Sequence, residues 1–176
     1  MVARVHSFWD SKWLYPAAAA ALVFAIVGVE RCPGMRSMAA DFSLPVVSVN
    51  GQNSPDRMRL GDQRGKVVLL DFWATWCRPC RITTPMLVRL GHRFHDRGLV
   101  VMGINIDQEG PGIVPDFAQH FGIDYPVLYD NAAVADRYGV HSLPTMILID
   151  RTGRIRQVHV GVATEGQLAD QIEDLL

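Results

Sequence analysis

Cys77 and Cys80 are separated only by Arg78 and Pro79, a spacing suited to reversible disulfide chemistry. Apolar residues recur every four positions after the pair, so we expect a helix that begins at the cysteines. One helical turn brings two sulfurs within bonding distance, and the aligned peptide dipoles at a helix start favour a thiolate. We therefore expect Cys77, at the exposed helix start, to be the nucleophile, and Cys80 to resolve the mixed disulfide that it forms.

The neighbours of the two cysteines favour a redox function over a structural one. Arg78 places a positive charge next to the Cys77 sulfur, and Pro79 removes a backbone donor and fixes φ in the first turn. Trp76 stands immediately before the pair. Two cysteines that are merely close, or half of a zinc site, are the alternatives. However, the chain has no second Cys-x-x-Cys motif and its six histidines are scattered. We expect no metal and no bound cofactor, because the disulfide itself is the redox group.

Asp71 is the one charged residue inside an otherwise apolar run that leads to the cysteines. Residues 66–73, KVVLLDFW, are rich in β-branched and aromatic side chains, which is typical of a strand buried on both faces. A carboxyl group between Leu70 and Phe72 is desolvated, so we expect its pKa to be raised. We expect Asp71 to take the proton from Cys80 when that thiol attacks, and to return it in the reverse step. The alternative is an aspartate that only bonds nearby backbone.

The remaining patterns alternate between strands and helices. Residues 41–60 form a lead-in strand or hairpin, and Thr164 with Gln167 forms a capping box for a last helix. We expect strands at 66–73, 99–106, 125–129, 145–149 and 155–160, and helices at 77–95 (kinked at Pro85), 113–121 and 132–138. This order predicts an α/β fold with a central mixed β-sheet flanked by helices.

Composition and charge favour one globular domain plus an appendage. The chain has 176 residues, 49% of them hydrophobic, and 17 Lys plus Arg against 18 Asp plus Glu. This balance gives no reason to expect a nucleic-acid partner. We divide the chain into residues 1–40, an N-terminal membrane anchor or signal with a linker, and residues 41–176, the catalytic domain.

Residues 13–29, WLYPAAAAALVFAIVGV, carry no charge and have aromatic residues at one end. A membrane-spanning helix needs about 20 apolar residues, with a lower limit of about 17, so the length favours an uncleaved anchor over a signal peptide. Residues 37–39, Ser-Met-Ala, are an alternative cleavage site that would give a secreted form. Charged residues directly before Cys32 argue against lipidation. Cys32 is either incidental or a thiol for an intermolecular disulfide or for electron entry.

Two motifs resemble those of thioredoxins. Residues 71–80, DFWATWCRPC, are similar to the thioredoxin active-site stretch, and residues 140–145, VHSLPT, are similar to the second hallmark of that family. The resemblance implies a thioredoxin-like fold in which Pro144 is cis and lies beside the disulfide. It also implies that the backbone of Leu143 pairs with the substrate. On this basis the substrate-contacting residues are Trp76, Arg78, Pro79, Leu143 and Pro144.

Residues 110–130 are longer than the corresponding part of thioredoxin and resemble the central insertion of the TlpA/ResA-like family. That resemblance implies a reductase anchored in the inner membrane, with its catalytic domain facing the periplasm. Its partners would be disulfide-containing proteins, including apocytochrome c in cytochrome c maturation, and a membrane or periplasmic electron donor. Two positions differ from the expected pattern. Thr83 stands where many members have a glutamate, and Gly103 stands where thioredoxin has a buried lysine beside its aspartate.

Other functions remain compatible with the sequence. A Cys-Arg-Pro-Cys pair is also compatible with an oxidant or an isomerase, because the direction of exchange depends on the reduction potential. A metallochaperone is a second class, in which both cysteines and a histidine such as His141 bind copper or zinc. A peroxiredoxin-like peroxidase is a third, although the residues ahead of Cys77 lack the usual threonine and proline of that class.

Overall fold

The computed structural model describes residues 37–48, 52 and 56–176. The predicted anchor at residues 13–29 and Cys32 lie outside the described residues, so their predictions stay untested. Within the described part, no helix combines the length and the apolar character needed to cross a bilayer.

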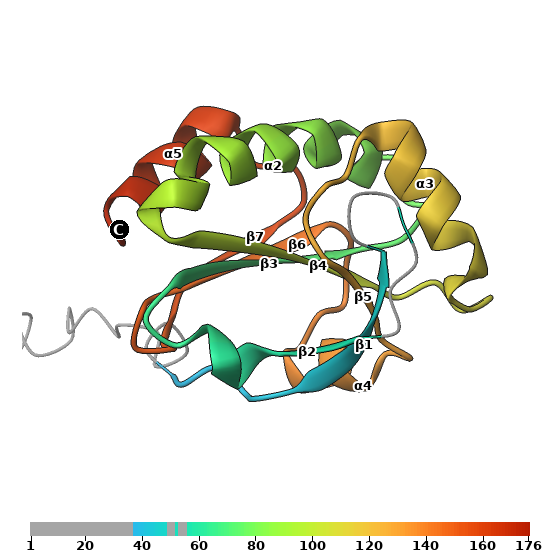
Figure 1. The fold of residues 1–176 in the computed structure, drawn as a ribbon, viewed down its shortest axis with the longest axis horizontal. Helices are drawn as coiled ribbons and strands as arrows, with labels where there is room; N and C mark the ends of the chain where they lie inside the picture. The colour runs from blue at the N-terminus through green and yellow to red at the C-terminus, as the bar shows by residue number, and fades with distance from the viewer. Residues whose placement is uncertain (1–36, 49–51, 53–55) are drawn as a thin grey trace, which may run out of the picture. The chain divides into compact units, whose positions relative to one another are not determined.

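A mixed β-sheet forms the centre of the described domain (Figure 1). The strand order is β2-β1-β5-β4-β3-β6-β7. β3 pairs in parallel with β4, and β4 with β5, while all other neighbours are antiparallel. The strands are β1 (Ser43–Ser48), β2 (Arg57–Arg59), β3 (Val67–Trp73), β4 (Leu99–Asn105), β5 (Val127–Tyr129), β6 (Thr145–Ile149) and β7 (Ile155–Val160). The predicted α/β class, mixed sheet and lead-in hairpin are confirmed.

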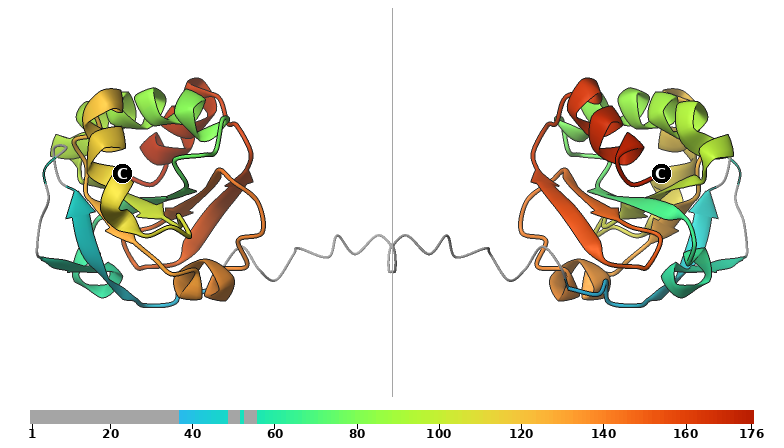
Figure 2. Two further views of the ribbon diagram at one scale, coloured as in Figure 1. Left: turned by 90° about the vertical axis from the view of Figure 1, so that its right-hand side faces the viewer. Right: turned by 90° about the vertical axis from the view of Figure 1, so that its left-hand side faces the viewer.

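Helices cover both faces of this sheet. The α-helices are α2 (Cys80–Phe94), α3 (Val114–Phe121), α4 (Ala133–Arg137) and α5 (Glu165–Glu173). α2, α3 and α5 lie on one face of the sheet, and α4 lies on the opposite face, as Figures 1 and 2 show. β3 is buried along its whole length because its side chains alternate between the two sides. Leu69 and Trp73 pack in the cluster below α2, whereas Leu70 and Phe72 pack in the cluster beside α4.

The main difference from the sequence prediction lies at the start of α2. The helix begins at Cys80 and not at Cys77, with Pro79 as the residue preceding it. Cys77 lies in the turn that leaves β3, where its backbone N–H donates to the carbonyl oxygen of Ala74 at 3.1 Å. The chain therefore passes through a turn between the end of β3 and the first residue of α2. α2 continues through Pro85 to Phe94.

The remaining elements agree with the predicted order and differ mainly at their ends. Thr164 caps α5 by accepting a hydrogen bond from the Gln167 N–H at 3.3 Å. α5 ends at Glu173, and Leu175, which follows the helix, packs partly buried against the same core cluster as Leu168 and Ile172. A 3-10 turn at Leu60–Gln63, which the sequence patterns did not indicate, joins β2 to the turn before β3.

The stretch predicted as a central insertion supplies one helix and one strand. It contains a 3-10 turn at Pro111–Ile113, then α3, and then β5. β5 pairs with β4 on one side and with β1 on the other, so it connects the N-terminal hairpin to the central strands. The insertion is therefore part of the sheet and not a loop on its surface.

Candidate active site

Cys77 and Cys80 form a disulfide at the N-terminus of α2, with their Cα atoms 5.3 Å apart. Cys80 is completely buried, and Cys77 is 3% exposed at the wall of a groove. The backbone N–H of Cys80 donates to Cys77 Sγ at 3.2 Å. A helix-start N–H directed at this sulfur stabilises negative charge on it after reduction, and the helix dipole acts in the same direction. The geometry thus gives the two sulfurs different environments.

Two buried threonines hold the first turn of α2 beneath the disulfide. The hydroxyls of Thr83 and Thr84 donate to the Cys80 carbonyl oxygen at 3.0 and 2.9 Å. Thr83 is the residue at the position of the family glutamate, and its side chain is 1% exposed. Thr83 cannot take over the acidic role of that glutamate, because its hydroxyl is packed against the backbone and has no proton that titrates.

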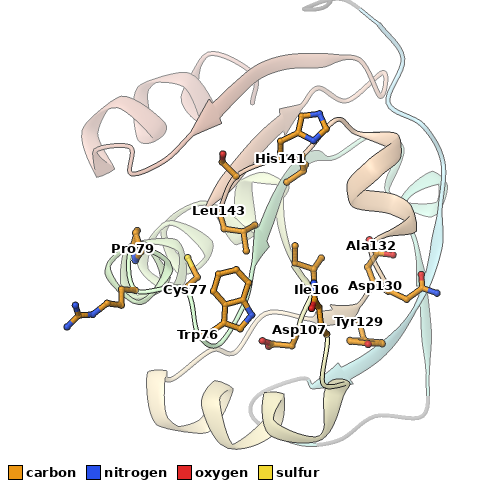
Figure 3. Close-up of a pocket in the computed structure, with 15 residues that line it drawn as sticks. Trp76, Cys77, Pro79, Ile106, Asp107, Tyr129, Asp130, Ala132, His141 and Leu143 are labelled. Carbon is orange, nitrogen blue, oxygen red and sulfur yellow. The ribbon is translucent and has the colours of Figure 1, made fainter.

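A groove of about 620 Å³ runs past Cys77. Four segments line it: residues 76–79, 106–108, 129–132 and 140–143. Figure 3 shows Cys77 and Leu143 on two walls of this groove, with the Trp76 ring between Cys77 and Ile106. Trp76 is 63% exposed, so a large apolar ring is free to contact a partner at the mouth of the groove. The strand ends and the helix start therefore bring together four loops that are far apart in the sequence.

The segment after α4 forms the wall facing Cys77. The peptide bond between Leu143 and Pro144 is cis, as the thioredoxin resemblance implied. Gly161 N–H donates to the Pro144 carbonyl oxygen at 2.8 Å, which joins this segment to the end of β7. Of the predicted substrate-contacting residues, Trp76, Arg78, Pro79 and Leu143 line the groove, whereas Pro144 is buried behind it.

Asp71 lies on the face of the sheet that α2 covers and is 1% exposed. Burial raises the pKa of its carboxyl from 3.8 to about 7, in agreement with the expectation from the apolar run. Its partner in the β3–β4 register is Gly103. Among the described residues no cation offsets the cost of burial, and Asp71 Oδ1 has no hydrogen-bond partner. A carboxyl in this environment is poised to exchange a proton near neutral pH.

Asp107, for which no sequence pattern predicted a role, holds the loop before the cysteines. Both of its carboxylate oxygens accept from the Thr75 N–H, at 3.2 and 3.1 Å, and one also accepts from the Thr75 hydroxyl at 3.0 Å. The Asn105 amide donates to the same carboxylate at 2.7 Å. One sequence feature could have predicted this role. Asn105 and Asp107 stand at the carboxyl end of a buried parallel strand, and functional sites in α/β sheets gather at that end of the strands.

His141 gives little support for a metal site with the two cysteines. It lies beyond Leu143 in the groove wall, and its ring points away from Cys77 (Figure 3). Across the residues that the structure describes, no three His, Cys, Asp or Glu side chains are grouped so that they would bind a metal ion.

Comparison with known proteins assigns this site to a family. The model of the AhpC/TSA family matches residues 35–158. The chain belongs to the AhpC/TSA family. It is 35% identical over 137 residues to the thioredoxin-like protein YneN of Bacillus subtilis, covering 77% of this chain and 76% of that protein. It is 34% identical over 118 residues to the thiol-disulfide oxidoreductase ResA of Geobacillus thermodenitrificans, covering 66% and 67% of the two chains.

Solved structures agree with this assignment. The crystal structure of a thiol:disulfide interchange protein DsbE from Chlorobium tepidum superposes with a TM-score of 0.73 at 31% identity, covering 80% of this chain and 96% of that one. The AhpC/TSA fold of this protein is therefore thioredoxin-like, as predicted. Together with the Cys77–Cys80 disulfide, these relatives show that this AhpC/TSA protein is a thiol-disulfide oxidoreductase.

Proposed function

We propose that this protein reduces disulfides in extracytoplasmic proteins, with apocytochrome c as one substrate, while held at the inner membrane by residues 13–29. The observation that carries the proposal is the position of the disulfide. Cys77 lies in the wall of an open groove, beside an exposed Trp76 and facing Leu143, whereas Cys80 is enclosed. A groove of this kind suits an extended cysteine-containing segment, which Leu143 binds through its backbone and Trp76 through its ring.

In the proposed reaction, the reduced protein attacks the substrate through the Cys77 thiolate. A sulfur–sulfur bond forms between Cys77 and the substrate, and the first substrate sulfur leaves as a thiolate. Cys80 then gives its proton to Asp71 and attacks the Cys77 sulfur, which releases the second substrate thiolate and forms the Cys77–Cys80 disulfide. Two electrons pass to the substrate. A dithiol donor, in the membrane or the periplasm, returns two electrons to the protein and completes the cycle.

The environment of Asp71 supports its proposed role as the proton acceptor. It shares one face of the sheet with the cluster that contains Cys80, and its pKa of about 7 lies between those of an ordinary carboxyl and an ordinary thiol. Such a group takes up a proton during thiol attack and still releases it near neutral pH. A carboxyl that only accepted backbone hydrogen bonds would have its pKa lowered.

The proposed location rests on the sequence and on redox chemistry. Residues 13–29 have the length and apolar character of an anchor, and a cleaved secreted form is the alternative. Disulfides that need enzymatic reduction accumulate in oxidising compartments such as the periplasm. We therefore place the catalytic domain on the outer face of the inner membrane. Fractionation of cells, with protease treatment of spheroplasts, tests this: retention in the membrane with a cleavable domain supports it, and a soluble periplasmic form indicates cleavage.

Trapping of the mixed disulfide tests the reaction. In a Cys80→Ser variant the second step is blocked, so the variant should accumulate a dithiothreitol-sensitive adduct with a peptide disulfide, and Cys77→Ser should accumulate none. The wild-type chain should catalyse insulin reduction by dithiothreitol. Metal bound in stoichiometric amounts without reductase activity would instead support a metallochaperone, and rapid peroxide turnover would support a peroxidase.

The reduction potential decides the direction of exchange. A Cys77–Cys80 reduction potential of about −270 mV would support a reductase. A potential of about −120 mV would indicate an oxidant and overturn the proposal. Equilibration of the full chain with glutathione or dithiothreitol, followed by thiol alkylation, gives this value.

A further inference from the structure

The first described segment, residues 37–42, is fastened to the start of β7 and to the turn before it. The Ser37 carbonyl oxygen accepts from the Ile155 N–H at 3.0 Å. The Ala39 N–H donates to the Gly153 carbonyl oxygen at 2.9 Å, and the side chain of Ala39 is buried. The chain therefore joins the domain at a defined place beside β7.

Two further elements hold the same segment. The Ala40 carbonyl oxygen accepts from the Tyr138 hydroxyl, which follows α4, at 2.7 Å. The Asp41 carboxylate accepts from the Arg59 side chain at 2.7 Å and from the Gly61 N–H at 2.8 Å. Residues 37–42 are thus part of the folded domain, and the linker to the predicted anchor ends at Ser37.

The place where the chain joins the domain lies at the end of the sheet opposite the groove. Ile155 is the first residue of β7 and pairs with Ile149, the last residue of β6. The Gly65 N–H donates to the Arg151 carbonyl oxygen at 2.9 Å, so β3 also begins here, and the C-terminus lies at the same end (Figure 1). The groove segments instead follow the ends of β3, β4 and β5 or precede β6. A strand of this length spans about 20 Å, which separates the two ends.

The linker is too short to let the domain turn over. Residues 30–36 separate Val29 from Ser37, and these eight Cα–Cα steps span at most about 29 Å. A domain of roughly 140 residues is about 37 Å across. If the groove faced the bilayer, Ser37 would stand at about that height, beyond the reach of the linker. A chain released as far as Ser43 would span about 50 Å, so the fastening of residues 37–42 sets the limit.

We infer that the end of the domain at which the chain joins it faces the bilayer, and that the groove opens away from the bilayer. This end, formed by residues 37–39, 63–66, 95–98 and 150–154, is named the linker end. The inference rests on the proposed anchoring by residues 13–29. It adds the class of partner to the proposed function: Cys77 exchanges with cysteines that stand clear of the bilayer, on soluble domains or on segments that project from it.

The exposed apolar side chains agree with this orientation. Among the described residues, Trp76 and Ile82 are exposed at the start of α2, and Val160 and Val162 are exposed at the end of β7. Both places are at the groove end. In the described part of the linker end, Met38 is the one large apolar side chain that is exposed. Exposed apolar groups mark surfaces that bind partners, so the groove end is suited to a protein.

The linker end is hydrophilic and carries more cations than carboxylates. Arg64, Lys66, Arg151 and Arg154 are exposed there, with Asp96 as the exposed carboxylate of the same turns. Lipid phosphates attract such cations when the surface lies within a few ångströms of the headgroups. A surface of this composition contacts headgroups without entering the hydrocarbon. The two ends of the domain thus differ in the way the orientation requires.

Quenching by nitroxide lipids tests the orientation. The full chain, with Cys32→Ser and an oxidised Cys77–Cys80 pair, carries one fluorophore on an added cysteine. The two exposed positions are Thr152→Cys, at the linker end, and Gln108→Cys, at the groove. Each chain is reconstituted in vesicles of phosphatidylcholine and phosphatidylglycerol that contain a lipid with a headgroup nitroxide. The fluorophore at position 152 should be quenched several-fold more than the one at position 108.

A longer linker is the matched control. Insertion of about twelve Gly and Ser residues after Gly34 raises the span of the linker to about 72 Å, so the domain can turn over and the difference between the two positions should fall. Circular dichroism like that of the wild type establishes that each variant is folded.

A reductase assay on the same vesicles gives a second readout. A disulfide peptide that is attached to the bilayer by an acyl chain and a short spacer should be reduced several-fold more slowly than the same lipidated peptide on a long spacer. The chain with the inserted linker should reduce the two peptides at similar rates, because its groove can reach the bilayer.

The outcomes separate this inference from the proposed function. Equal quenching at the two positions, or stronger quenching at position 108, would overturn the orientation. A full difference that persists after the insertion would also overturn it, because the linker would then not set the orientation. Recovery of the wild-type chain in the soluble fraction would overturn the anchoring, and a wild type that does not reduce insulin would overturn the reductase assignment.

Discussion

Replacing the buried carboxyl Asp71 with asparagine should make the protein more stable at neutral and alkaline pH. The side chain is 1% exposed and no cation in the described residues compensates its charge, so the ionised form is unfavourable in the folded state. Asparagine has nearly the same shape and no charge. The difference between the two proteins therefore isolates the free energy of ionising this one group.

The sign and size of the effect follow from proton linkage. Below pH 3.8 the carboxyl is protonated in both the folded and the unfolded chain, so it gives no pH dependence. Between pH 3.8 and about 7 the folded protein keeps a proton that the unfolded chain has lost, so stability falls as pH rises. Each tenfold difference in proton affinity is worth about 1.4 kcal/mol. The free energy of unfolding of the wild type therefore falls by about 4 kcal/mol in total, and this fall is complete above about pH 7.

Guanidinium denaturation of the oxidised proteins at intervals from pH 4 to 8.5 measures this effect. The free energy of unfolding of Asp71→Asn, relative to wild type, should rise by about 4 kcal/mol across the range and then level off. Contributions from other titrating groups cancel in the difference. Asp174→Asn, which removes an exposed carboxylate, controls for the loss of one negative charge from the protein. A difference for Asp71→Asn that stays constant with pH would refute the reasoning, because it would mean that the folded carboxyl titrates as in the unfolded chain.

Two further substitutions test the contacts that position the site. Asp107→Ala removes the acceptor of the Thr75 N–H, the Thr75 hydroxyl and the Asn105 amide, so we expect a loss of about 3 kcal/mol in chemical denaturation and slower attack by Cys77. Unchanged stability and attack rate would show that the loop before the cysteines is held without this carboxylate. Thr164→Ala removes the α5 cap and should cost about 1 kcal/mol with the reductase rate unchanged, whereas Thr164→Ser should restore the stability. If the reductase rate of Thr164→Ala also fell, the result would show that α5 is coupled to the active site.

Short-range patterns determined most of the elements and the reactive pair. The apolar run at residues 66–73 fixes β3 because such a continuous run has to be buried on both sides. The spacing of Cys77 and Cys80 after that strand indicated the disulfide, and Asp71 stood out because its charge breaks the run. The capping pair Thr164 and Gln167 located the start of α5 correctly, since capping is a contact between residues three apart.

Tertiary structure decided everything that depends on contacts between distant segments. α2 starts at Cys80 instead of Cys77, after a loop whose Thr75 is held by Asp107 from beyond the end of β4, and no periodicity shows such a contact. The groove exists because four loops meet where strands end, and only the strand order brings them together. The surroundings of Asp71 are of the same kind. Gly103 came into register with it as the family resemblance implied. The close approach of the Trp73 indole and the Tyr125 ring to Gly103 depends on side-chain packing between β3, β4 and the segment before β5, for which the sequence carries no local signal.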